Sequence, residues 1–337
     1  MGVAQQKSGF SREQLFKFGS VYAFLALINL RVKLSLAPAW FDGSLTSNHQ
    51  LLLAFKYANN EQSRLLQFYI PEAFHRLLGL SVIHAYMLQR WLFVLMAFVC
   101  FHFYLRKWFS PKLAFAGVIF LAAIMPLAYF NELQESTPLL LLTFLLALWA
   151  IREHRPGWYV AVITLGAANN ETVLILPAVF FFYNFKRFAP GHVLRLSLTT
   201  LAGALPAYIV FGVIRDINWD RPRLAQAWQW PNNIRGIWEQ LGTSPLEYWA
   251  AVNFYFLFIF GVFWLYAFLD YGKKPLFLRR AALMIPLFVL AHLLTSIFAE
   301  VRLMLPLSFL LIPMAFFYLF PENQETVDES SLTNPVI

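Results

Sequence analysis

The sequence predicts an all-α, polytopic integral membrane protein with about ten transmembrane helices, some of them paired in short hairpins. Three observations predict this class. Hydrophobic residues make up 59% of the 337 residues and charged residues only 13%, whereas soluble domains carry about 25% charged residues. Apolar stretches near the length of a membrane-crossing helix, about 20 residues, recur along the chain. One such stretch is interrupted in its middle by a compact polar segment.

That polar segment is Ala168-Asn169-Asn170-Glu171-Thr172, inside an apolar run over residues 158–185. The run is too long for one ordinary crossing and too short for two full ones. Basic residues flank both of its ends, and basic residues mark the cytoplasmic side. We therefore predict a hairpin of two short helices that enters from the cytoplasm and turns at residues 169–171. Glu171 would then face an aqueous cavity that opens to the non-cytoplasmic side. The alternative is one long tilted helix whose polar middle is buried by neighbouring helices.

The other elements follow in chain order. Residues 18–36 form a retained signal anchor, and the outer loop after it, about 37–80, is helical and apolar enough to lie on the membrane surface. In this loop Thr46 or Ser47 is expected to cap one helix, and Pro71 to lie in the first turn of another. The remaining crossings are expected at residues 81–105, 113–130, 138–151, 194–214, 248–269, 281–298 and 303–320, with a second short hairpin turning at 131–135.

This order predicts a single transmembrane domain over residues 1–320, with outer loops at about 37–80 and 215–247. Residues 321–337 are expected to be a disordered cytoplasmic tail. Both termini are then cytoplasmic, and 15 of the 26 basic residues fall in the predicted inner segments. The net charge of +8 suits cytoplasmic loops that face anionic membrane lipids, and nothing in the sequence indicates nucleic-acid binding.

Acidic residues at the tips of the tight turns are candidate site residues. Glu132, Glu171 and Glu300 occupy such tips on the predicted outer side. Together with Asn170 they could line a cavity that holds a divalent ion through oxygen ligands, or one of them could act as a general base. Alternatively, each acid only stabilises the N-terminus of the helix that follows it, where negative charge is favourable.

Arginines on the predicted outer side are candidate anion ligands. Arg302 follows Glu300 by two residues, which predicts either a local ion pair or a guanidinium that binds a phosphate. Arg31, Arg215 and Arg235 could bind phosphate in the same way, or extend to the membrane interface. The histidines show no metal-ligand spacing, and the sequence lacks the glycine-rich nucleotide motifs and the serine-hydrolase elbow. Nucleotide-driven pumping and serine hydrolysis therefore have no support.

Three stretches resemble bacterial polytopic glycosyltransferases of the GT-C superfamily, especially its small relatives. Residues 166–174 resemble the short-hairpin segment of that family, in which an arginine often stands at the place of Asn170. The stretch Ala299-Glu300-Val301-Arg302 resembles the acidic-x-Arg entry into a final helix. Residues 78–108 resemble the second helix after a large first outer loop. The likeness covers most of the chain as a layout.

The resemblance implies a function, a location and roles for several residues. It implies that a sugar passes from a polyprenyl-phosphate donor to a glycan or lipid acceptor on the extracytoplasmic face of the bacterial inner membrane. Asp42, the acid near the first helix, would be the base that deprotonates the acceptor hydroxyl, although the family often has a close acidic pair there and Asp42 has no acid beside it. Arg302, or another outer arginine such as Arg235, would bind the donor phosphate, with a divalent metal such as Mg²⁺ or Mn²⁺ as a possible partner.

Two other classes of function stay open at this point. The chain could be a transporter or lipid flippase whose broken hairpins line a substrate path. It could also be a non-catalytic subunit of a membrane complex. Position decides between them: convergence of Asp42, Glu171 and Glu300 at one outer place would favour an enzyme.

Overall fold

The structure, a computed structural model, describes residues 12–57, 60–129, 135–217, 228–241, 259–297 and 300–321. All regular secondary structure in these ranges is helical. Six segments within them are long and apolar enough to cross a membrane, so the chain is an all-α, polytopic membrane protein, as predicted. These segments are residues 16–36 of α1 (Arg12–Leu36), α4 (Val82–Leu105), α5 (Pro111–Ile124) with η3 (Met125–Ala128), α9 (Pro190–Ile217), α14 (Leu276–Ala282) with α15 (Met284–Thr295), and η7 (Val301–Leu307) with α16 (Ser308–Leu319).

Three shorter apolar segments stand among these spans: α6 (Ser136–Arg152), α7 (Pro156–Ala167), and η4 (Glu171–Ile175) followed by α8 (Leu176–Asn184). The count of about ten crossings stays a prediction. Half of the crossing expected at 248–269 lies outside the described residues, and the described half shows only the short α13 (Phe263–Tyr266); η6 (Tyr271–Lys273) follows it. The expected turn at 131–135 lies outside them as well, except for Glu135.

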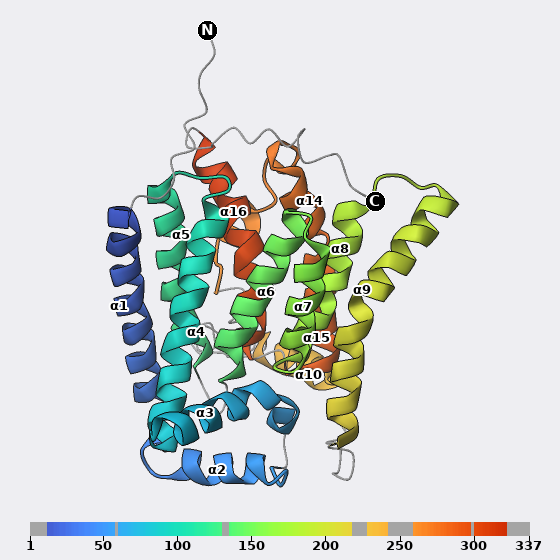
Figure 1. The fold of residues 1–337 in the computed structure, drawn as a ribbon. Coiled ribbons are helices and arrows are strands. Elements are labelled where there is room, and N and C mark those ends of the chain that lie inside the picture. Colours follow the sequence, from blue (N-terminus) through green and yellow to red (C-terminus); the bar gives the residue numbers. More distant parts are fainter. Residues whose placement is uncertain are drawn as a thin grey trace.

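The helices form one upright bundle with two distinct ends (Figure 1). α1 begins and α16 ends at the end where α14 lies, called here the α14 end. The short helices of the first loop, α2 (Ser44–Leu53) and α3 (Leu65–Leu78), lie across the opposite end, called here the α2–α3 end. Two 3₁₀ turns complete this loop, η1 (Pro38–Trp40) and η2 (Asn60–Ser63), so it is helical, as predicted. Which end faces the cytoplasm stays a prediction.

The two helix starts expected in this loop are wrong. α2 begins at Ser44 after Gly43, which has a left-handed backbone (φ +89°), so neither Thr46 nor Ser47 is its cap. α3 begins at Leu65, which places Pro71 inside the helix rather than in its first turn. A proline leaves the carbonyl four residues earlier without its helical donor. Here that carbonyl belongs to Gln67, and it accepts a hydrogen bond from Gln89 Nε2 of α4 at 3.2 Å, which compensates for the missing donor.

The hairpin predicted at residues 158–185 is present. α7 ends at Ala167, and the chain turns back before η4 begins at Glu171, so the alternative of one long helix is wrong. The two arms run antiparallel: the Tyr159 and Phe180 rings stack with centroids 5.3 Å apart, and the His154 and Tyr183 rings do so at the same separation nearer the α14 end. Close packing at the tip depends on Gly166, because a Cβ there would lie 2.9 Å from Val173 Cγ1.

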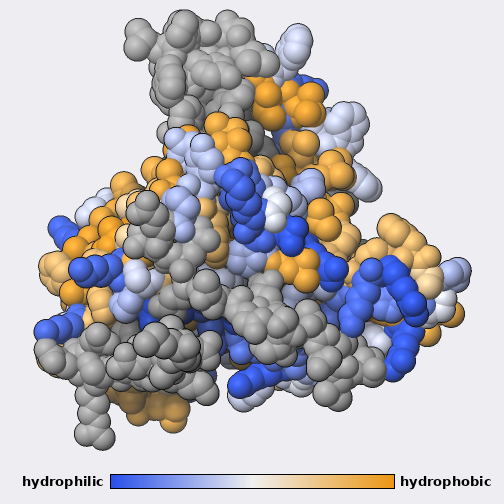
Figure 2. All heavy atoms as spheres, turned by 90° about the horizontal axis from the view of Figure 1, so that it is seen from above, coloured by the Kyte–Doolittle hydropathy of each residue, from blue (hydrophilic) through white to orange (hydrophobic). Residues whose placement is uncertain are grey.

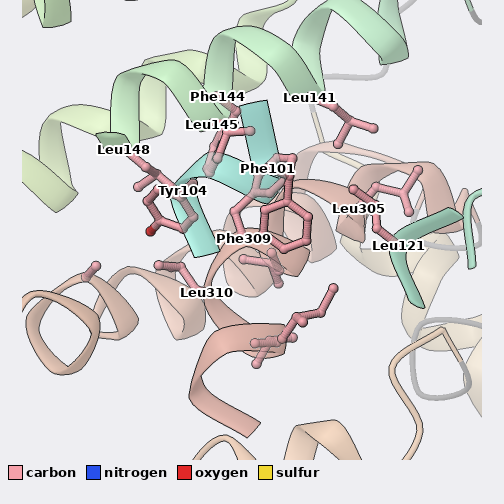
Figure 3. Close-up of a cluster of buried hydrophobic side chains, with 14 of the residues drawn as sticks. Phe101, Tyr104, Leu121, Leu141, Phe144, Leu145, Leu148, Leu305, Phe309 and Leu310 are labelled. Carbon is pink, nitrogen blue, oxygen red and sulfur yellow. The ribbon is translucent and has the colours of Figure 1, made fainter. Parts of the chain in front are cut away.

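The core of the bundle surrounds α6, whose residues are nearly all buried. Figure 3 shows how α4, α6 and α16 meet there: Phe101, Phe144 and Phe309 come from the three helices and lie together. The Phe101 and Phe309 rings meet edge to face with centroids 5.1 Å apart. Because α6 is surrounded by protein, its N-terminal end at residues 135–136 is held in a fixed place, and the candidate site is built around that end.

The α14 end carries many of the basic residues that were predicted to be cytoplasmic. Figure 2 looks onto this end and shows hydrophilic side chains among hydrophobic ones. Lys186 and Arg187, between α8 and α9, are exposed, as is Lys273, which pairs with Asp270 at 2.9 Å. Their gathering at one end is consistent with the predicted orientation, in which this end faces the cytoplasm.

Candidate functional site

Glu171 lies at the tip of the hairpin and is only partly covered. The residue before it, Asn170, has an extended backbone and caps η4, because its Oδ1 accepts a hydrogen bond from the Thr172 N–H at 3.0 Å. The capping hydrogen bond therefore comes from Asn170, while Glu171 lies in the first turn of η4, where its negative charge is favourable as the alternative reading expected. The Glu171 side chain keeps 36% of its surface exposed and extends toward an arginine on another element.

That arginine is Arg64, between η2 and α3. Its Nη2 lies 3.7 Å from Glu171 Oε1, and its Nη1 donates a hydrogen bond to Glu61 Oε1 at 2.9 Å. Arg64 and Glu61 are nearly fully buried. The backbone fastens the same two elements together, because the Leu66 N–H donates to the Ala168 carbonyl at 3.3 Å. The first loop therefore covers the hairpin tip and places a guanidinium beside its carboxylate.

A second ion pair comes from the start of the last helix. Arg302 Nη2 donates to Glu300 Oε2 at 2.6 Å, so the predicted local pair is present, with the arginine nearly buried and the glutamate about one-third exposed. The charges of Arg302 and of Arg215, at the end of α9, also act on the Glu171 carboxylate, and the charge of Glu300 acts on Arg64. Three carboxylates and three guanidinium groups from four parts of the chain thus gather at the α2–α3 end.

Beneath this charged group lies a layer of buried amide side chains around the N-terminus of α6. Gln67 Oε1 accepts from the Ser136 N–H at 3.0 Å, and Asn169 Nδ2 donates to the Ser136 carbonyl at 2.8 Å. Asn170 Nδ2 donates to Ser136 Oγ at 3.4 Å. The tip of the hairpin and α3 therefore hold the first residue of α6 from two sides.

Several polar atoms in this layer are buried without a hydrogen-bond partner among the described residues. They include Gln67 Nε2, Gln89 Oε1 and Asn169 Oδ1, and Arg64 Nε and Glu61 Oε2 above them. Leaving one such atom unpaired costs about 1–3 kcal/mol, so groups of them are rare and indicate a water, a ligand or a functional constraint. Similar atoms, such as Tyr104 Oη and Trp108 Nε1, occur elsewhere in the bundle, so it is the combination of this group with the ion pairs around Glu171 that marks the candidate site.

A further charged cluster lies deeper and was missed in the sequence. Arg90 of α4, Glu135 before α6 and Lys33 of α1 are all buried and form ion pairs, at 2.7 Å between Arg90 Nη1 and Glu135 Oε1 and at 3.5 Å between Lys33 Nζ and the same oxygen. An arginine inside an apolar crossing was the available signal, because an ionisable residue in a membrane segment needs a partner there. From the sequence, Glu135 is instead expected in the short hairpin turn at 131–135.

The structure separates the other predicted site residues. Asp42 is exposed on the loop before α2, and the hydrogen bond that it accepts from the Ser44 N–H at 2.9 Å lowers the pKa of its carboxyl group. In the described part of the chain, its carboxylate is not among the groups that contact Glu171 or Arg64. The convergence of all three acids that would favour an enzyme is therefore not found within the ranges that the structure describes: Glu171 and Glu300 share one charged group, and Asp42 is not part of it. Arg235 is exposed on α10 (Trp230–Leu241), and Glu132 lies outside the described residues.

The gathered carboxylates do not form a typical divalent-cation site. No group of three His, Cys, Asp or Glu side chains in the described ranges is placed to hold a metal ion. Glu61 and Glu300 each accept a hydrogen bond from an arginine, and Glu171 lies beside Arg64. Guanidinium groups so placed suit an anion better than a cation. A metal ion therefore stays a prediction, and no chemical step below depends on it.

Comparisons with known proteins do not place the chain in a family. The chain matches no model of a known protein family, no curated protein and no solved structure. The relationship to GT-C enzymes stays a prediction from the three stretches quoted above, two of which, around Glu171 and Arg302, lie at the candidate site.

Proposed function

We propose that this chain is a membrane glycosyltransferase that uses a polyprenyl-phosphate sugar donor, with Glu171 at the reaction centre. One observation carries the proposal. A partly exposed carboxylate, at the tip of a hairpin, lies beside the buried Arg64 and within electrostatic range of Arg215 and Arg302. Such a place holds a base and an anion-binding group side by side, which is what sugar transfer from a phosphate requires.

In the proposed reaction, Glu171 takes the proton from an acceptor hydroxyl. The hydroxyl oxygen forms a bond to the anomeric carbon of the donor sugar, and the bond from that carbon to the phosphate oxygen breaks. The phosphate leaves with the electron pair, and the proton stays on the Glu171 carboxylate. A positioned general base contributes about 10²–10⁴-fold in rate. The 3.7 Å separation from Arg64 is longer than a hydrogen bond, which leaves the carboxylate oxygen able to accept that proton.

The leaving phosphate gains negative charge in this step, and the nearby arginines would stabilise it. A guanidinium presents its N–H groups as a planar fork that matches two phosphate oxygens. Arg302 is held in place by Glu300, and Arg64 by Glu61, so both forks are oriented before a substrate arrives. Preorganised donors of this kind stabilise developing charge strongly in a site that excludes water.

The proposal moves the base from Asp42, which the resemblance suggested, to Glu171. Asp42 lies in an exposed turn whose carboxylate is occupied by a local backbone hydrogen bond. Glu171 lies among the buried polar groups that a substrate could use. In the cell, the proposal places the α2–α3 end on the extracytoplasmic face of a bacterial inner membrane, with both termini in the cytoplasm.

A transporter or lipid flippase is the second candidate, and one observation favours it. The charged group lies at two interrupted segments, the α7–η4–α8 hairpin and the junction between α15 and η7. Broken helices around a polar site are typical of secondary transporters. A transporter would move the lipid or its sugar without breaking the bond to phosphate, so product analysis separates the two candidates.

The test uses the full-length protein in lipid nanodiscs with a panel of short-chain polyprenyl-phosphate sugars and an alcohol-linked glycan acceptor. Sugar transfer and donor binding are measured separately. We expect Glu171→Gln to lower turnover by about 10²–10⁴-fold while donor binding is retained, and Arg302→Gln to weaken donor binding. Glu153→Gln is the matched control, because Glu153 is also a partly exposed glutamate in an ion pair with an arginine but lies at the α14 end.

Asp42→Asn decides between the two carboxylates. Normal turnover in Asp42→Asn with loss in Glu171→Gln supports the proposal. The reverse pattern would return the role of base to Asp42 and overturn the assignment to Glu171. If the wild-type protein transfers no sugar from any donor, but moves a fluorescent polyprenyl-phosphate sugar across a vesicle membrane, the transporter is the correct function.

A further inference from the structure

The helix α10 at the α2–α3 end is strongly amphipathic. In Figure 1 it runs across the lower ends of the upright helices and lies against the end of α15. Its attachment is specific: Asn233 Nδ2 donates to the carbonyl groups of Leu293, at 2.7 Å, and Ser296, at 2.8 Å. The Gln229 N–H donates to the Leu294 carbonyl at 2.8 Å. α10 and the residue before it therefore supply donors to carbonyl groups in and just after the last turn of α15, where helical partners are lacking.

The side chains of α10 divide into three faces. Asn233 and Ile237 face the bundle, where Asn233 is buried and Ile237 packs against the hydrophobic core. A second face is apolar but exposed, with exposures of 48% at Trp230, 46% at Ile234 and 75% at Trp238. The third face is exposed and polar, and it consists of Asn232, Arg235 and Glu239.

The order of these faces around the helix is informative. At about 100° per residue, the Trp230–Ile234–Trp238 stripe lies between the bundle-facing side and the polar side. A helix that lies flat on a bilayer next to a transmembrane bundle needs this order, because it must contact protein, hydrocarbon and water on three successive faces. In a helix surrounded by water, the exposure of two tryptophans and an isoleucine in one stripe would be unfavourable.

The stripe also continues a lipid-facing surface. α14 and α15 together form a candidate span, and its outer side exposes Leu283, Leu287 and Leu290, spaced as one helical face. Ile297, just after this helix, is exposed as well. α10 is bonded to the end of α15, so its tryptophans stand where the hydrocarbon-facing surface of that span finishes. Tryptophan is enriched at this depth, where its ring lies among the lipid headgroups.

We propose that α10 lies in the headgroup layer of the bilayer, with Trp230, Ile234 and Trp238 toward the acyl chains and Asn232, Arg235 and Glu239 toward water. The partner of this surface is the phospholipid bilayer itself. Through Asn233, the same helix fixes the end of α15 at headgroup depth. Arg302 lies a few residues beyond that end, so the inference gives its approximate depth. It does not depend on the proposed glycosyl transfer, since it concerns the position of a helix and not a reaction.

Site-directed spin labelling tests the proposal. Single cysteines are introduced at positions 234, 238, 232 and 239 of the full-length Cys100→Ala protein, labelled, and studied in phospholipid nanodiscs. The relaxation of each spin label by oxygen, which concentrates in hydrocarbon, is compared with its relaxation by a water-soluble nickel chelate. We expect oxygen to dominate at 234 and 238 and the chelate to dominate at 232 and 239, so that the ratio alternates with the helical period.

Two other patterns would overturn the proposal. Access of the chelate to all four positions would show that the helix lies in water. Poor access of both reagents to 234 and 238 would show that a second copy or another protein segment covers the stripe. A measurement without labels guards against misfolded variants: quenching of tryptophan fluorescence by brominated lipids should be weaker in Trp238→Phe than in the wild-type protein. Equal quenching in the two proteins would also count against the proposal.

Discussion

Arg90 of α4 donates from Nη1 to both carboxylate oxygens of Glu135, at 2.7 and 2.8 Å, where neither side chain reaches solvent. The guanidinium also lies 4.2 Å above the centre of the Tyr129 ring, and the Tyr129 hydroxyl donates to Asn29 Oδ1 at 2.5 Å. The pair thus joins α1, α4 and the beginning of α6. Glu135 directly precedes Ser136, which bonds the hairpin tip and α3. The ion pair therefore helps to fix the position of the candidate site.

Loss of this pair should destabilise the protein strongly. Removing one partner of a buried ion pair costs about 3–5 kcal/mol, because the other charge stays buried without compensation. We expect Arg90→Met to lower the thermal unfolding midpoint in detergent well below that of the wild type. Arg76→Met is the control: it breaks the pair with Glu72, but the Arg76 side chain is 74% exposed, and such pairs contribute about 0–1 kcal/mol. Equal shifts in the two variants would contradict the prediction.

The attachment of α2 should depend on pH through His49. Its Nε2–H donates to Glu72 Oε2 and its Nδ1 accepts from the Tyr86 hydroxyl, both at 3.0 Å. Burial lowers the pKa of His49 below its ordinary value of 6.5, and this effect outweighs the nearby carboxylate. The folded state therefore binds the proton less readily than the unfolded state, so the contribution of His49 is complete above pH 6.5 and is lost as the pH falls below it.

The measurement is the unfolding midpoint between pH 7.5 and 5. We expect a decline in the wild type that is smaller in His49→Gln, which cannot titrate. The hydrogen bond from His49 lowers the pKa of the Glu72 carboxyl group below its ordinary value of 4.5. The stability that Glu72 contributes is therefore lost only below pH 4.5, outside the pH range of this measurement. A wild-type midpoint that rises as the pH falls to 5 would refute the prediction.

Close packing at the hairpin tip should make Gly166 intolerant of a side chain. A Cβ at this position would lie 2.9 Å from Val173 Cγ1 and 3.3 Å from Thr143 Oγ1. Overpacking of this kind costs about 1–3 kcal/mol. Gly212→Ala is a matched control, because Gly212 also lies in a helix and a Cβ there meets nothing within 4 Å. We expect a lower unfolding midpoint in Gly166→Ala only; a normal midpoint would show that the tip has room.

The orientation of the bundle can be measured with single cysteines at exposed positions of the two ends. On a Cys100→Ala background, Glu239→Cys reports the α2–α3 end and Arg187→Cys the α14 end. We expect a membrane-impermeant thiol reagent added to intact cells to label position 239 but not 187. Labelling in the opposite sense would place the candidate site in the cytoplasm and exclude an extracytoplasmic reaction.

Local polarity was enough to predict the hairpin, because three polar residues inside an apolar run have few stable positions in a membrane. The sequence also allows the prediction that Glu171, Glu300 and Arg302 lie near one another, because each stands at the end of an apolar segment. Contacts between distant segments were not predictable. Pro71 is tolerated inside α3 only because Gln89, on another helix, bonds the carbonyl that it leaves free. Arg64 gave no sign in the sequence that it would cover Glu171, since its position depends on how the first loop folds back.

The hydrogen bonds at the hairpin tip carry a consequence for biogenesis. α7 and α8 have 12 and 9 residues, so neither is long enough to be inserted as an independent transmembrane segment during synthesis. Among the described residues, the polar tip has contacts with Ser136, with the backbone of Leu66 and with the Arg64 guanidinium, all of which are made earlier in the chain. We therefore expect the hairpin to enter the membrane as one unit, after the first loop and α6 have been made. In this order of assembly, the first loop and α6 provide the contacts on which the segment that carries Glu171 is placed.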